Sequence, residues 1–222
     1  HLKTLRVSPQ NRLRLASDIA FHFRGASAEV GKKILSQTGL EVANGSTIGI
    51  APNMRVYERV PGEGRNNRYV SLLINICRRL YENYGCEVVI VPHEIRIGAD
   101  DDDRYLALKI QEALPGVGIN AIMDKHSAAE IKAVIRNLDY LVASRYHTIV
   151  AALSLRVPTI ALGWSHKYQE LLRSVNLANY AFGLDSLDKH ALEKVLYAWE
   201  RRKELRNILE SNVPKLEESS RM

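Results

Sequence analysis

Short runs of consecutive apolar residues alternate with longer segments of helical periodicity from Thr47 to the end of the chain. Each run is rich in Val, Ile, Leu and Ala without intervening polar residues, which is typical of strands buried on both faces of a parallel sheet. We predict six such strands, at residues 47–53, 86–93, 119–125, 139–144, 157–164 and 180–184.

Amphipathic segments separate the predicted strands. Residues 68–85 place Val70, Leu73, Ile74, Cys77 and Leu80 at helical spacing. Ser127 and Glu130 have the spacing of a capping box, which opens another helix. The predicted helices are 68–85, 104–116, 127–138, 147–156, 166–176 and the chain after 186, and residues 55–67 are predicted to be a polar loop.

Six strand-then-helix units predict an α/β fold with a doubly wound parallel sheet, Rossmann-like, with helices on both faces. We expect residues 46–222 to form this lobe and to end in C-terminal helices. Residues 1–45 do not join the pattern, and we interpret them as a connector and the tail of a preceding N-terminal lobe.

The composition is that of an ordinary globular protein, with 46% hydrophobic and 25% charged residues. The net charge of +6 is spread over helix surfaces without the grouped aromatic residues of a nucleic-acid binder, so we expect no nucleic-acid partner. No apolar stretch reaches the length of a transmembrane helix, and no signal peptide is visible. Cys77 and Cys86 form no metal motif and are expected to be buried. We expect a cytoplasmic protein, with the inner face of the membrane as an alternative location.

Polar residues follow the predicted strands at their carboxyl ends, where a doubly wound sheet binds its ligands. Arg145, His147 and Lys167 lie in the loops after two consecutive strands. A guanidinium suits a carboxylate or phosphate, and an imidazole can donate a proton near neutral pH. Because helix N-termini also attract anions, these residues predict an anion pocket with an acid–base group. Other candidates at this edge are Asn53, Arg55, His93, Asp103 and Ser144.

Structural explanations exist for the same residues. Arg-x-His after a strand also occurs in surface loops and helix caps, and His93 could be a partly buried histidine bonded to backbone. Asn53 is a common turn residue, and the acidic residues 100–103 also suit a helix N-terminus. Motifs of NAD enzymes, P-loop kinases, α/β-hydrolases and zinc proteases are absent from the sequence.

The segment SRYHTIVAALSLRVPTIALGWSHK (144–167) resembles the signature of the polysaccharide pyruvyl transferase family. That signature has Ser-Arg-x-His, an Ala-rich helix, Val-Pro before an apolar strand, and a Lys that begins the next helix. Three further segments are similar to the family in the same order: DIAF (18–21, with Ile19 in place of Pro), TIGIAPNMR (47–55) and VVIVPHEIRIGADDDDRYLALKI (88–110).

The resemblance implies a GT-B-like pair of Rossmann-like lobes, of which this chain would be the C-terminal, donor-binding one. Family members transfer pyruvyl, usually as a ketal, from phosphoenolpyruvate to a sugar of a cell-surface polysaccharide such as an exopolysaccharide. By that resemblance His147 and Lys167 would be catalytic, and Ser144 and Arg145 would bind the donor. Arg55, His93 and Asp103 match less specific positions and, with Asn53 at the end of the first strand, are further substrate-binding candidates.

The expected partners are phosphoenolpyruvate and a sugar or lipid-linked saccharide acceptor, without a metal or other cofactor. An isolated C-terminal lobe could bind the donor without catalysing transfer, and an oligomer is left open. Two other functions remain open as well: a GT-B-type glycosyltransferase or sugar epimerase that uses a nucleotide-sugar, and a non-catalytic binding lobe.

Overall fold

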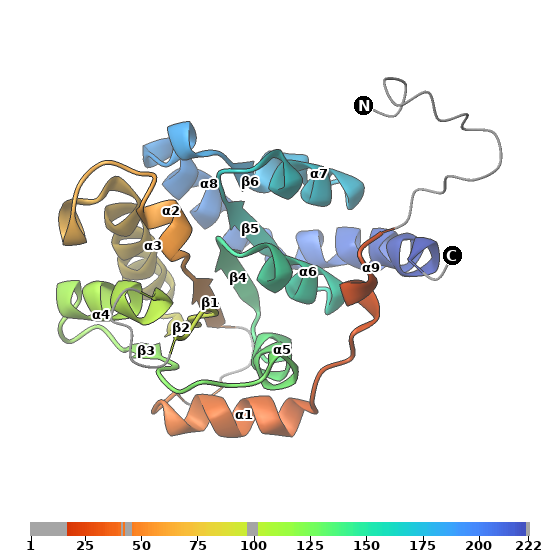
Figure 1. Ribbon diagram of the computed structural model, residues 1–222, viewed down its shortest axis with the longest axis horizontal. Coiled ribbons are helices and arrows are strands. Elements are labelled where there is room, and N and C mark those ends of the chain that lie inside the picture. Colours follow the sequence, from red (N-terminus) through yellow and green to blue (C-terminus); the bar gives the residue numbers. More distant parts are fainter. Residues whose placement is uncertain (1–16, 41, 43–45, 97–101, 221–222) are drawn as a thin grey trace.

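The computed structural model describes residues 17–40, 42, 46–96 and 102–220. Within this part of the chain, six strands form one sheet in the order β3-β2-β1-β4-β5-β6, and every neighbouring pair is parallel (Figure 1). The strands are β1 (Thr47–Ala51), β2 (Glu87–Ile90), β3 (Ile119–Ala121), β4 (Tyr140–Ala143), β5 (Thr159–Leu162) and β6 (Ala181–Phe182).

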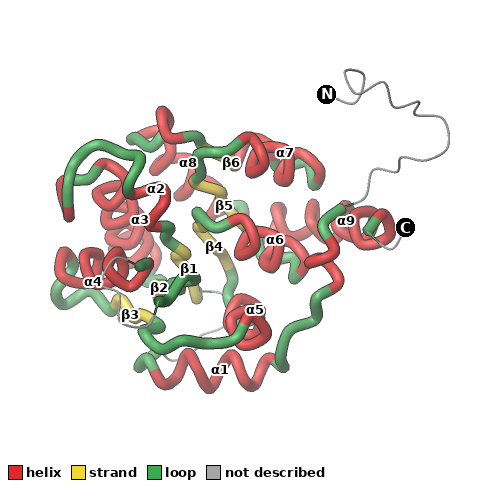
Figure 2. Tube along the Cα trace, viewed as in Figure 1, coloured by secondary structure: helices red, strands yellow, loops and turns green. Residues whose placement is uncertain are grey.

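Helices cover both faces of the sheet (Figure 2). On one face, α3 (Arg68–Tyr84) packs against α4 (Asp103–Ala113) and α8 (Lys189–Glu200). On the other, α6 (Tyr146–Ser154) packs between α5 (Ala128–Arg136) and α7 (His166–Ser174), with α9 (Arg202–Ser219) alongside. The predicted doubly wound α/β fold is therefore confirmed.

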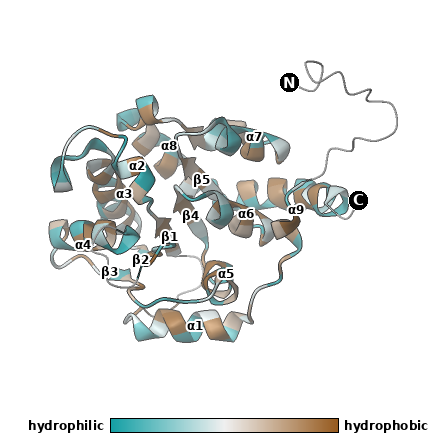
Figure 3. Ribbon diagram, viewed as in Figure 1, coloured by the Kyte–Doolittle hydropathy of each residue, from teal (hydrophilic) through white to brown (hydrophobic). Residues whose placement is uncertain are grey.

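The core follows from the continuous apolar strands. Every residue of β1, β4 and β5 is buried, as expected for strands covered on both faces. Figure 3 shows these strands in hydrophobic colours, whereas helices such as α1 (Ala28–Gln37) and α4 alternate hydrophobic and hydrophilic positions. Cys77 and Cys86 are buried free thiols, as predicted, and burial raises the pKa of each to about 12.

The structure corrects several predicted boundaries. The strands are shorter than the apolar runs, because the residues after each strand turn into loops or helix caps. The predicted loop 55–67 contains two short helices, α2 (Met54–Tyr57) and the 3-10 helix η3 (Gly64–Asn66). Asn53 caps α2, since its side chain accepts a hydrogen bond from the backbone N–H of Arg55 at 2.9 Å.

The helical C-terminal region is divided at Arg201 into α8 and α9. The predicted capping box of α5 is confirmed. The backbone N–H of Glu130 donates to Ser127 Oγ at 3.3 Å, and that of Ser127 donates to Glu130 Oε2 at 2.8 Å.

The described part of the N-terminal region packs on the same lobe. Helix α1 lies against α5, and the 3-10 helix η2 (Ile19–His22) lies against α6 and α9 (Figure 1). His22 Nε2 hydrogen-bonds the carbonyl of Glu217 at 2.7 Å, so this segment is tied to the last helix. The assignment of residues 1–45 to a connector and preceding lobe stays a prediction, and 1–16 and the boundary at 43–45 lie outside the described residues.

Candidate functional site

His147 and Lys167 line one cavity at the carboxyl edge of the sheet. Strands β4 and β5 are neighbours, so the helices that follow them, α6 and α7, begin side by side. His147 is the second residue of α6 and Lys167 the second of α7. The cavity, which we call the large cavity, has a volume of about 830 Å³ and is also lined by Asp18, Tyr146, Trp164, Ser165, Tyr168 and Glu170. The structure therefore brings together two of the three residues on which the predicted anion pocket depends.

The wall of the large cavity is held by Tyr168. Its hydroxyl donates to the carbonyl of Ser144 at 3.0 Å, and its ring meets the ring of Tyr146 edge-on at 6.2 Å. The ring lies against Gly163, where an added Cβ would come within 2.4 Å of it. Glycine at the end of β5 is therefore required for this packing.

The guanidinium of Arg145 is already paired with two carboxylates. Its Nε and one Nη donate to Asp103 at 3.0 and 2.6 Å, and the other Nη lies 2.8 Å from Glu94 Oε2. Burial disfavours charge on this guanidinium, but the hydrogen bonds and negative charges of Asp103 and Glu94 together outweigh burial and raise its pKa. Arg145 precedes α6 without lining the large cavity. Its donor-binding role stays a prediction, and it would require one of these carboxylates to move.

Asp103 is a structural centre of the carboxyl edge. Its side chain is fully buried and accepts hydrogen bonds from the backbone N–H groups of Met54, His93 and Glu94, at 2.9, 3.2 and 2.9 Å. Together with Arg145, these contacts join α2, the loop after β2 and the start of α6. The predicted substrate-binding role of Asp103 is untested, and both of its oxygens are already bonded within the protein.

Asn53 and Ser144 belong to a buried hydrogen-bond network. Asn53 Nδ2 donates to the carbonyl of Ser144 at 2.7 Å, and the Tyr69 hydroxyl donates to Ser144 Oγ at 2.7 Å. Burial raises the pKa of Tyr69, so its phenol remains a donor at neutral pH. These residues hold the ends of β1 and β4 in place, and their predicted contact with substrate stays a prediction.

The last two candidates lie apart from the large cavity. Arg55 is exposed and pairs with Glu58 at 3.1 Å. His93 hydrogen-bonds Thr148 Oγ1 through Nδ1 at 3.2 Å. Burial, and next the charge of Arg145, lower the pKa of His93, which favours the neutral imidazole.

A second cavity of about 290 Å³, which we call the small cavity, lies between α5, α6 and the segment around η2. His93 and His147 both line it, so His147 stands between the two cavities. Sequence reasoning missed two of its other lining residues, Phe23 and Lys132. The available signal was Lys132 itself, a charged residue within the apolar segment IKAVI of α5.

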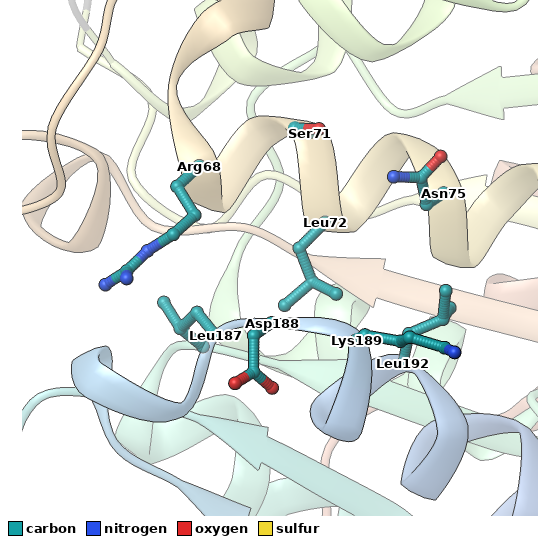
Figure 4. Close-up of a pocket in the computed structure, with 8 residues that line it drawn as sticks. All are labelled: Arg68, Ser71, Leu72, Asn75, Leu187, Asp188, Lys189 and Leu192. Carbon is teal, nitrogen blue, oxygen red and sulfur yellow. The ribbon is translucent and has the colours of Figure 1, made fainter.

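Two further hollows contain none of the predicted site residues. One, of about 460 Å³, shares Trp164 with the large cavity, and the Arg59 guanidinium lies 4.6 Å from the centre of the Trp164 ring. The other lies between α3 and the start of α8, where Arg68 and Asp188 extend from opposite sides (Figure 4). Arg68 donates to the carbonyl of Leu184 at 2.7 Å, which joins α3 to the loop between β6 and α8.

Solved structures with the same fold include sugar-transferring enzymes. The chain is similar to the ADP-heptose LPS heptosyltransferase II of E. coli, with a TM-score of 0.52 and 16% identity over 84% of this chain and 53% of that one. It is also similar to a UDP-forming α,α-trehalose-phosphate synthase from Burkholderia xenovorans, with a TM-score of 0.54 and 11% identity over 90% of this chain and 48% of that one. The chain thus spans about half the length of these proteins, and the likeness confirms the GT-B-like lobe.

Two comparisons of the sequence with known proteins bear on the family of this chain. A search of curated proteins finds no match. The sequence model of the family described as polysaccharide pyruvyl transferase matches residues 2–166, which include the Ser-Arg-x-His segment and end one residue before Lys167. The chain therefore belongs to the polysaccharide pyruvyl transferase family.

Proposed function

We propose that this lobe takes part in transferring a pyruvyl group from phosphoenolpyruvate to a sugar of a cell-surface polysaccharide, with His147 as the proton donor. The observation that carries the proposal is the position of His147, at a helix start between two cavities and with Lys167 in one of them. Membership of the family supports the choice of reaction. Phosphoenolpyruvate is made in the cytoplasm, which is where we expect the reaction. Among the described residues, no helix has both the length and the hydropathy of a membrane-spanning helix.

The proposed reaction is a proton transfer followed by two additions at C2 of the donor. The His147 imidazolium gives its proton to the terminal carbon of phosphoenolpyruvate, which becomes the methyl group, and C2 becomes cationic. A sugar hydroxyl attacks C2 and its proton returns to the imidazole. The C2–O bond to phosphate then breaks, a second hydroxyl attacks C2, and its proton leaves with the phosphate. The products are a cyclic ketal and inorganic phosphate.

The exposure of His147 suits this role. Its ring contacts Tyr146 edge-on at 5.7 Å, and it makes no hydrogen bond or ion pair to another part of the chain that the structure describes. Both ring nitrogens are therefore available to reactants. Arg145 offers α6 no side-chain cap, so backbone N–H groups at this helix start remain available to an anion. Lys167 adds a positive charge across the large cavity, and we expect transfer to depend on it as well.

A glycosyltransferase that uses a nucleotide-sugar is the second candidate, because the similar solved structures include a heptosyltransferase and a UDP-forming synthase. Thermal-shift titrations of the 222-residue chain distinguish the two. We expect phosphoenolpyruvate to raise the melting temperature, since a ligand that binds only the folded state stabilises it. Stabilisation by ADP- or UDP-sugars, and none by phosphoenolpyruvate, would contradict the proposal.

A further inference from the structure

The small cavity combines apolar walls with three nitrogen bases. Its apolar surface comes from Ala20, Phe23, Ile131, Ile135 and Ala151, and its bases are His93, Lys132 and His147. Lys132 is only 4% exposed although it carries an ammonium group. Burying a charge without a counter-charge is costly, so a lysine at this position calls for an explanation.

No carboxylate among the described residues pairs with Lys132. Its Nζ donates to the backbone carbonyl of Phe23 and lies 5.7 Å from the centre of the Phe23 ring. The negative charge of Glu217 acts to raise the pKa of Lys132, but this carboxylate already pairs with Arg156 at 2.9 Å. Burial, and next the charge of Arg136, lower the pKa of Lys132 to about 8. The small cavity therefore has positive charge beside it that the protein itself leaves without an anion.

A purely structural role does not explain why a charged side chain is buried at position 132. Lys132 could attach the segment at the start of α1 to α5, but three hydrogen bonds from neutral or exposed groups already make this connection. The backbone N–H of Ala26 donates to the carbonyl of Ala129 at 2.9 Å, Arg136 donates to that of Arg24 at 3.0 Å, and Asn137 to that of Ala28 at 2.9 Å. The charge of Lys132 is more simply explained by a ligand.

The large cavity differs in character, because it has carboxylates as well as a lysine. Asp18 and Glu170 line it together with Lys167 and the rings of Tyr146 and Trp164. Trp164 is 49% exposed, although it is a large aromatic residue. Aromatic faces and carboxylate acceptors suit a sugar ring and its hydroxyl groups better than they suit a dianion.

We propose that the small cavity binds the anionic donor, with Lys132 as a contact to its phosphate or carboxylate, and that the large cavity binds the saccharide acceptor. This inference rests on the proposed function and adds to it the side of His147 on which each substrate lies. His147, which lines both cavities, would then face the donor carbon and the acceptor hydroxyl. The two lysines are thereby separated, with Lys132 on the donor side and Lys167 on the acceptor side.

Calorimetric titration of phosphoenolpyruvate into the 222-residue chain tests this division. The variants are Lys132→Met, Lys167→Met and, as a matched control, Lys125→Met, which removes an exposed lysine outside both cavities. We expect Lys132→Met to weaken binding at least about 10-fold, because a charge-assisted contact is lost. Lys167→Met should weaken it less, and Lys125→Met should leave it unchanged. Inorganic phosphate and pyruvate, titrated separately, show which anionic group depends on Lys132.

A loss of binding in Lys132→Met should not be caused by unfolding of the variant. Replacing a buried, unpaired ammonium by Met should leave the melting temperature equal or higher below pH 8, where Lys132 is charged. Ala128→Leu provides a second test, since it narrows the small cavity without changing charge and should also weaken binding. Wild-type affinity in a folded Lys132→Met variant, or in Ala128→Leu if the lysine variant does not fold, would overturn the inference but not the proposed function. If wild-type chain does not bind phosphoenolpyruvate, the proposed function itself is wrong.

Discussion

Arg145 shows how a side chain suited to a ligand can be used by the protein itself. The Arg145 side chain is 15% exposed. The fully buried Asp103 lies on one side of its guanidinium, and the partly exposed Glu94 lies on the other. A buried pair of this kind depends on all its partners, because an uncompensated charge in the interior is costly. We therefore expect the two carboxylates to differ strongly in their contribution to stability.

Asp103→Asn should lower the free energy of unfolding by about 3–5 kcal/mol, because it leaves the buried guanidinium without its main counter-charge. Glu94→Gln removes a carboxylate from the same guanidinium at the exposed side and should cost less than about 1 kcal/mol. Urea unfolding of both variants at neutral pH measures the difference. Equal losses would show that Asp103 is not the residue on which the position of Arg145 depends.

At the level of elements, neighbouring strands place the helix starts, and the helices place the side chains. The strand pattern predicted that Arg145, His147 and Lys167 would come to one edge, since β4 and β5 follow each other in the chain and in the sheet. The pattern did not predict where each side chain points. Arg145 and Ser144 are directed into internal networks, whereas His147 and Lys167, each second in its helix, line the large cavity.

Helix α2 was missed because its stability comes from tertiary contacts. It has only one turn, and the Asn53 cap and the bond from Met54 N–H to Asp103 hold its start. Asp103 is 49 residues further along the chain, so a local pattern carries no sign of this bond. The same holds for Lys132, whose contact with Phe23 spans 109 residues.

The close packing of α1 on α5 gives a prediction at this scale. Gly31 faces α5, and an added Cβ would lie 2.1 Å from the carbonyl oxygen of Ala133. Gly31→Ala should therefore destabilise the protein by about 1–3 kcal/mol, despite the higher helix propensity of alanine. Urea unfolding measures the effect, and Gly118→Ala is the control because nothing lies within 4 Å of its added Cβ. A Gly31→Ala variant as stable as the wild type would contradict the docking of α1 on α5.

For the whole molecule, sequence patterns predicted the doubly wound sheet, the family and the edge at which the candidate residues lie. Continuous apolar strands that alternate with helical segments indicate this fold, because a parallel sheet with both faces covered by helices buries such strands. The small cavity was beyond such reasoning, since it forms where η2, α5 and α6 meet and only the assembled lobe has it. The similar solved structures are about twice as long as this chain.

The central claim is that His147 protonates the donor. The most direct measurement is saccharide-dependent release of phosphate from phosphoenolpyruvate by the protein, compared between wild type and His147→Ala. We predict a fall in kcat of about 10²–10⁴-fold, the usual contribution of a positioned acid. The circular dichroism spectrum and melting temperature should be unchanged, because the side chain is exposed. Full activity in a folded His147→Ala variant would contradict the account.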